Sequence, residues 1–242
     1  GHQADDGWLG PPQNSGTDYW ARSNAVLSLI QFAEGAPTTA ETDNATQAVL
    51  RFLLCEQARV IKTPLTSWAA QRGQDLALGV AWMLRQPAPV VAAEERARLW
   101  DLADALRAQT VDWESWFNTF DNDAGPHNVN NAQGLKSAAV WYSLTGNETL
   151  RRLSRSRMTN MDDRYGLPTG MFNGDELLPS PPTRSPSRGI ELCGVVEAMF
   201  SYSTMFSTFG DVAYADRAER IAFNALPATW ASPKGGDMWS HQ

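Results

Sequence analysis

Cysteine is almost absent from the 242-residue chain, which has only Cys55 and Cys193, and this scarcity excludes a disulfide scaffold. Basic residues do not gather in one stretch, and the formal net charge is −7, which argues against a nucleic-acid-binding surface. No run reaches the roughly 18 apolar residues that a membrane-spanning helix needs. The N-terminal stretch GHQADDGWLG has neither the basic start nor the apolar segment of a signal peptide. We therefore expect no nucleic-acid partner and no membrane segment in these residues.

Aromatic residues are abundant, with ten Trp, nine Phe and five Tyr. Most should lie in the core, because aromatic side chains bury the largest apolar areas, although a surplus of flat rings also suits a site that stacks sugars. Trp113, Trp116, Phe117 and Phe120 recur at the spacing of one helical face, which predicts a buried stripe. Trp8 stands between glycines in DGWLGP, which indicates a loop, and we expect its ring to stack on substrate.

Apolar residues recur with a helical period through most of the chain, and no segment shows the alternation of a β-strand. The pattern predicts an all-α protein of about eight helices in antiparallel pairs, with glycine or proline between segments. Repeated hairpins of this kind suggest an (α/α) toroid by analogy, although no sequence repeat of fixed period is present. The paired segments are residues 17–35 with 39–62, 67–86 with 92–110, 130–146 with 148–166, and 189–210 with 212–226.

Two irregular segments interrupt the helical pattern, residues 120–131 and residues 165–189. A loop as long as the second is commonly either functional or disordered. Apolar residues within it favour an ordered loop, and two such loops at one end of the hairpins predict a cleft. These apolar residues are Met171, Phe172, Leu177 and Leu178.

Glu191 and Cys193 stand two positions apart where the second loop meets the next helix. Such residues point roughly 200° apart on a continuous helix, but face the same way in an extended segment. Gly189 favours an extended start, and a carboxylate and a thiolate are both ordinary zinc ligands. Alternatively, Cys193 is a small buried residue and Glu191 an acid favoured at a helix start, and spacing alone leaves both interpretations open. Cys55 lies on an apolar helical face and is expected in the core.

Six short motifs follow one another along the chain: DGWLGP, GPHNVNNAQGLKSAAVWY, FNGDE, RGIELCGVVEAMFSY, YADRAERIAFNALPA and GGDMWSHQ. Together, and in this order, they resemble the β-L-arabinofuranosidase family, glycoside hydrolase family 127. The resemblance implies an (α/α)6 barrel that acts on a carbohydrate substrate and holds a zinc ion bound by one Glu and three Cys. It further implies that Glu191 and Cys193 are two of the zinc ligands, that Glu176 is the acid/base, and that His127 lies in the substrate pocket.

The family's other two cysteines are adjacent, and one of them is the nucleophile, but this sequence contains no such pair. We therefore expect residues 1–242 to form part of one catalytic domain, truncated at both ends, with about four of the six hairpins. Divergence with replaced ligands or loss of the metal is the alternative explanation.

Other interpretations remain open at this level. Glu176 could form a turn with Gly174, and His127 could cap the following helix instead of bonding sugar hydroxyls. The chain could also be a zinc-free α/α-toroid enzyme, such as an epimerase or an unsaturated-uronyl hydrolase, or a non-catalytic sugar-binding descendant. Asn44 and Asn147 begin N-glycosylation triplets, which matter only if the protein is secreted. The sequence defines neither the compartment, the oligomeric state nor the natural glycan.

Overall fold

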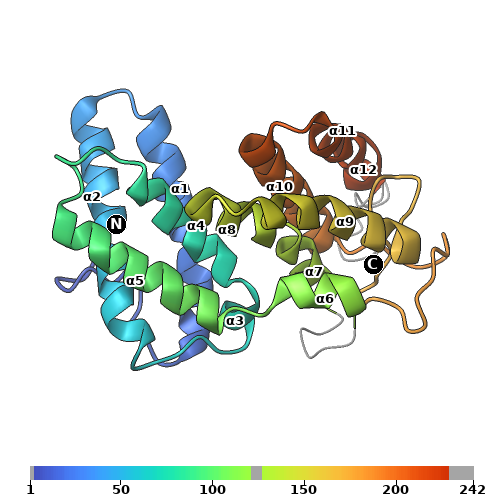
Figure 1. Cartoon of the computed structure of the whole chain (residues 1–242), viewed down its shortest axis with the longest axis horizontal. Helices are drawn as coiled ribbons and strands as arrows, with labels where there is room; N and C mark the ends of the chain where they lie inside the picture. The colour runs from blue at the N-terminus through green and yellow to red at the C-terminus, as the bar shows by residue number, and fades with distance from the viewer. Residues whose placement is uncertain (1–2, 121–126, 229–242) are drawn as a thin grey trace, which may run out of the picture. The chain divides into compact units, whose positions relative to one another are not determined.

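The computed structural model describes residues 3–120 and 127–228, and helices dominate both ranges (Figure 1). Within them, β-type pairing between backbone segments is limited to isolated bridges. The predicted all-α class is therefore confirmed. None of the described helices is long and apolar enough to cross a membrane. The chain divides into two compact units between Val111 and Asp112, and each is described by itself. The motif GGDMWSHQ lies outside the described residues.

Unit 1 is built from two helical hairpins, α1 (Tyr19–Gly35) with α2 (Thr39–Val60) and α4 (Gly73–Leu84) with α5 (Ala93–Gln109). A short 3-10 turn, η1 (Gly16–Asp18), precedes the first hairpin, and α3 (Trp68–Gln71) precedes the second. In addition, α2 packs on α5 and α1 on α4, so the helices enclose an apolar core. Its side chains, each at most 2% exposed, include Val26, Val49, Phe52, Leu53, Leu76, Val80 and Leu102.

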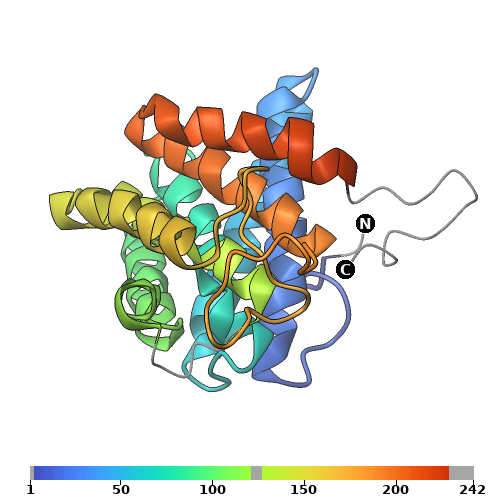
Figure 2. The same ribbon diagram turned by 90° about the vertical axis from the view of Figure 1, so that its right-hand side faces the viewer.

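Unit 2 contains the second pair of hairpins. In this unit α8 packs against α9, α10 against α11, and α7 along α10. Figure 2 shows α10 and α11 side by side. The elements are α6 (Trp113–Thr119), α7 (Asn128–Gly134), α8 (Ser137–Thr145), α9 (Glu148–Tyr165), α10 (Leu192–Phe209), α11 (Val212–Arg220), the π-helical η2 (Ile221–Ala225) and α12 (Leu226–Ala228). With the two pairs of unit 1, all four helix pairings expected from the sequence are in contact.

The turns of the unit 2 hairpins follow from local sequence. Gly146 and Gly210 end α8 and α10 with φ values of 64° and 65°, a left-handed conformation that glycine adopts without steric cost. Asn147 and Asp211 come next, and each side chain accepts a backbone N–H from the first turn of the following helix. These four residues therefore fix where one helix stops and the next begins.

The structure differs from the expected helices in three places. Residues 67–86 form two helices, α3 and α4, because Arg72 leaves helical geometry with φ −120° and ψ 17°. Residues 130–146 divide into α7 and α8, and the last expected helix passes from α11 into a π-helical turn. In addition, α6 forms a separate short helix, whose Trp113, Trp116 and Phe117 are buried as their spacing predicts, whereas Phe120 is the left-handed C-cap residue and only partly buried.

Candidate functional site

The loop between α9 and α10 is packed onto unit 2 by its own apolar residues. Met171, Phe172 and Leu178 are buried, whereas Leu177 is 50% exposed. Near the start of the loop, the Asn173 N–H donates to the carbonyl of Tyr165 at 2.8 Å. The predicted ordered loop is therefore present, with three of the four expected apolar anchors.

Glu176 lies beside the start of α7. The N–H of Asn128 donates to the Glu176 carbonyl at 2.9 Å, and a backbone bridge joins His127 to Leu177. The side chains also approach, with His127 Nε2 3.7 Å from Glu176 Oε1. The Glu176 side chain is 74% exposed and that of His127 only 20%, so the carboxylate faces solvent while the imidazole is mostly enclosed. The structure thus brings together these two predicted site residues, which are 49 positions apart in sequence.

The same loop also contacts the segment that leads into α10. Gly174 accepts a backbone hydrogen bond from Glu191 at 3.3 Å and donates one to Gly189 at 3.1 Å. Two residues after Gly174 comes Glu176, and two residues after Glu191 comes Cys193. Three stretches that are remote in sequence therefore lie against one another, namely residues 127–128, 174–177 and 189–191.

Glu191 is the N-cap residue of α10 and has an extended backbone, with φ −65° and ψ 129°. Although it is an acidic residue, Glu191 is buried and only 5% exposed. Cys193 follows in the first helical turn and is half-buried. The extended geometry that the sequence predicts for the pair is therefore present at Glu191 but not at Cys193, which is helical.

Metal-binding capacity is limited in the part of the chain that the structure describes. Residues 3–120 and 127–228 contain no group of three or more His, Cys, Asp or Glu side chains arranged to hold a metal ion. Glu191 and Cys193 offer the carboxylate and thiol chemistry that zinc accepts, but they amount to two ligands, whereas protein zinc sites use three or four.

Asn128 is a residue whose role the sequence did not reveal. It is fully buried, and its Nδ2 donates to the carbonyl of Gly174 at 2.7 Å. A Cβ atom at Gly174 or at Gly194 would lie 3.1 Å from the Asn128 amide group, so both glycines permit its close approach. The available signal was a run of asparagines, NVNN, at the end of the first irregular segment, where the expected helix of residues 130–146 begins.

Arg217 holds the other end of the loop. Its Nη1 donates to Asp162 Oδ1 at 2.7 Å and to the carbonyl of Gly170 at 3.0 Å. The hydrogen bond that Arg217 donates to Asp162 raises the pKa of the guanidinium, which therefore stays charged. This contact ties the start of the loop to α9 and α11.

Trp8 lies in unit 1, and its environment differs from the one expected. The ring is 2% exposed, its Nε1 donates to the carbonyl of Pro11, and its edges contact Tyr19 and Phe52. The guanidinium carbon of Arg22 lies 4.9 Å from the ring centroid and that of Arg59 4.7 Å. In this conformation neither face of the ring is open to a sugar. The structure of unit 1 therefore does not support the expectation that Trp8 stacks on substrate. Its short loop is folded inward because glycine at position 7 lets the chain approach α2.

Comparison with known protein families gives a match over most of the chain. The family model described as β-L-arabinofuranosidase, GH127 catalytic domain, matches residues 3–239. Neither the curated proteins nor the solved structures that were compared with the chain gave a match. The matched range spans both units and includes Glu176, Glu191 and Cys193.

Proposed function

Since the chain belongs to the GH127 catalytic-domain family of β-L-arabinofuranosidases, whose fold is an α/α toroid, we propose that it hydrolyses an arabinofuranoside with Glu176 as acid/base. The observation that carries this proposal is the approach of His127 to Glu176, 3.7 Å between Nε2 and Oε1, on a loop tied to the start of α10. Family membership supports glycoside hydrolysis over a zinc-free epimerase or uronyl hydrolase.

Glycoside cleavage needs an acid that protonates the departing oxygen and a nucleophile or base on the opposite side of the sugar. The Glu176 carboxyl is exposed and can therefore reach the glycosidic oxygen of a bound substrate. Its backbone is fixed by the Asn128 N–H, so the side chain starts from a defined position. His127 beside it can donate a hydrogen bond to a sugar hydroxyl or to the carboxylate.

We also propose that Glu191 and Cys193 are two of the ligands of a zinc ion. The extended conformation of Glu191 supports this, because it takes Glu191 out of the continuous helix that would turn the two side chains roughly 200° apart, while Cys193 lies in the first turn of α10. Zinc, when bound, would hold a coordinating thiol as thiolate near neutral pH. The further ligands that such a site needs are not among the described residues.

The catalytic proposal is tested with an aryl β-L-arabinofuranoside and the full chain. We expect turnover with retention at the anomeric carbon, and a decrease in kcat of about 10²–10⁴-fold for Glu176→Gln, the usual contribution of an acid/base. Glu219→Gln, at an exposed position of α11, is the matched control and should leave kcat unchanged. Binding of arabinose without any turnover would instead identify a non-catalytic sugar-binding protein.

The zinc proposal has a readout that does not depend on activity. Zinc content per chain, measured by elemental analysis after dialysis against a zinc buffer, should fall for Cys193→Ser, because a hydroxyl is a poorer zinc ligand than a thiolate. Cys55→Ser, which changes a buried cysteine of unit 1, should not alter zinc content. Equal zinc content in both variants would rule out Cys193 as a ligand.

A further inference from the structure

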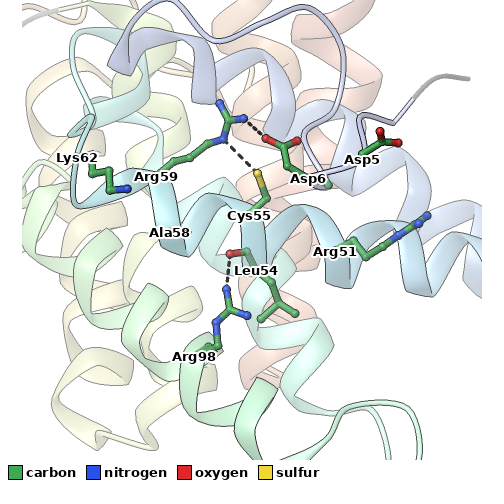
Figure 3. Close-up of a pocket in the computed structure, with 10 residues that line it drawn as sticks. Asp5, Asp6, Arg51, Leu54, Cys55, Ala58, Arg59, Lys62 and Arg98 are labelled. Atoms are coloured by element: carbon green, nitrogen blue, oxygen red, sulfur yellow. Dashed lines mark hydrogen bonds and ion pairs between the residues drawn. The ribbon is translucent and has the colours of Figure 1, made fainter.

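Unit 1 contains a pocket of about 450 Å³ between the N-terminal segment, α2 and α5 (Figure 3). Small-molecule sites in proteins commonly have volumes of about 300–1,000 Å³, so this pocket is large enough for a sugar residue. All of its described lining residues belong to unit 1, whereas Glu176 and the start of α10 belong to unit 2.

Basic side chains dominate the lining. Arg51, Arg59 and Lys62 lie on α2 or directly after its end, and Arg98 comes from α5. The α2 positions are spaced by eight and three residues, which places them on or near one helical face. Four basic residues and two acidic ones, Asp5 and Asp6, thus line one pocket in a chain whose net charge is −7.

Only part of this positive charge is neutralised within the protein. Asp6 forms an ion pair with Arg59, and hydrogen bonds from the Trp8 N–H and from Arg59 lower the pKa of the Asp6 carboxyl. Arg59 Nε also donates to the Cys55 thiol at 3.2 Å. The charges of Asp6 and Arg59 therefore balance each other, and the dashed lines in Figure 3 mark the contacts of Arg59 with Asp6 and Cys55.

Arg98 and Lys62 lack such a balance. Arg98 donates to the carbonyl of Leu54 at 2.8 Å and to Gln57 Oε1 at 3.2 Å, and both of these acceptors are neutral. No carboxylate in residues 3–120 or 127–228 lies within ion-pair distance of Lys62 or Arg98. Arg51 lies closer to the N-terminus of α2, and in Figure 3 its guanidinium points away from Lys62 and Arg98.

We propose that this pocket binds an oligomer of acidic sugars, with one carboxylate near Lys62 and Arg98 and hydroxyl groups near Asp5. Carboxylates pair well with lysine and arginine, and charge-assisted hydrogen bonds are stronger than neutral ones. Asp5 would repel a simple anion, but a sugar acid also presents hydroxyl donors that an exposed aspartate accepts. The mixture of basic groups with the Asp5 carboxylate therefore favours a uronic acid over inorganic phosphate.

The test is a titration of the full chain with a galacturonate oligomer, followed by calorimetry or by NMR shifts of unit 1. Galactose oligomers of equal length and inorganic phosphate serve as the uncharged and the non-sugar ligand. We expect the galacturonate oligomer to bind most tightly of the three ligands. Its affinity should decrease with added salt, because ionic strength screens exposed charges. Phosphate binding as tight as galacturonate would overturn the assignment to a sugar acid.

Variants localise the interaction. Lys62→Gln should weaken galacturonate binding about tenfold, the typical effect of losing one hydrogen bond to a charged group, and Lys62→Arg should restore most of it. Arg85→Gln, at an exposed position after α4, is the matched control and should bind as the wild type does. Glu176→Gln should also bind normally, so a failed catalytic proposal and a failed pocket are distinguishable. Circular dichroism checks that Lys62→Gln and Arg85→Gln are folded. If folded Lys62→Gln binds galacturonate as tightly as the wild type does, the proposal is overturned.

Discussion

The side-chain amide of Asn128 donates a 2.7 Å hydrogen bond to the carbonyl of Gly174, 46 residues later in the chain. The same carbonyl accepts the N–H of Glu191, and a Cβ at Gly194 would lie 3.1 Å from the Asn128 amide nitrogen. One buried amide thus contacts both the loop that carries Glu176 and the first turn of α10. Its removal should loosen the spacing between these two parts of the candidate site.

Asn128→Ala should therefore lower both stability and turnover. The substitution removes a buried hydrogen bond and leaves the Gly174 carbonyl with only the longer bond from the Glu191 N–H. We expect the free energy of unfolding to decrease by about 2 kcal/mol. A displaced Glu176 should lower kcat about tenfold or more, with a smaller change in KM. Denaturant unfolding and steady-state kinetics measure the two effects. The matched control is Asn160→Ala, which removes a 2.8 Å bond from Asn160 Nδ2 to the Phe117 carbonyl and should not change kcat.

Gly7→Ala should destabilise unit 1. Gly7 has φ +97°, and an added Cβ would lie 2.4 Å from the backbone oxygen of Arg51 in α2. Strain and overlap together predict a loss of about 2–4 kcal/mol in the free energy of unfolding. Gly35→Ala is the control, since no atom lies within 4 Å of its added Cβ and alanine is the better helix former. Equal stability of the two variants, measured by thermal unfolding, would contradict the close packing of the DGWLGP loop on α2.

Glu56 makes the stability of unit 1 depend on pH. It is fully buried, neither carboxyl oxygen has a hydrogen-bond partner among the described residues, and burial raises its pKa from 4.5 to about 8. Between these values the unfolded state has released the proton while the native state still holds it. Native stability therefore falls as pH rises through this window, and the penalty is constant above it.

Glu56→Gln removes the titration while keeping a similar shape. We expect the variant to exceed the wild type by roughly 3–5 kcal/mol in unfolding free energy at pH 8.5 and by little at pH 4.5. Denaturant titrations at several pH values measure the difference, and Glu94→Gln, at an exposed position of α5, should follow the wild type. A constant difference between Glu56→Gln and the wild type across this range would show that Glu56 does not titrate with a raised pKa.

The two cysteines should differ in reactivity. Burial raises the pKa of the Cys55 thiol, and the residue is 8% exposed, whereas Cys193 is half-buried. Because alkylation requires an accessible thiolate, iodoacetamide at pH 8 should modify Cys193 roughly tenfold faster than Cys55, as peptide mass mapping can measure. Added zinc should slow modification of Cys193 alone. Equal rates at the two sites would contradict the burial of Cys55.

The sequence by itself determined the helical content and the pairing of helices. The recurrence of Val49, Phe52 and Leu53 at helical spacing marks the buried face of α2, and the Gly146-Asn147 turn separates α8 from α9. Such features are local, since a helix forms from contacts three and four residues apart and stops where glycine or a capping side chain permits. Gly189 likewise favoured an extended start before the last hairpin, and the structure has Glu191 extended and Cys193 already in the first turn of α10.

Only the tertiary structure decided how remote segments meet. Trp8 stands in a glycine-rich loop, yet it is buried against Tyr19 and Phe52 because that loop folds onto α2. The approach of His127 to Glu176 and the link from Asn128 to Gly174 depend on hydrogen bonds between segments 46 or more residues apart. No periodicity encodes such pairings, because they arise when packing of whole helices brings polar groups to one place and burial requires that they find partners.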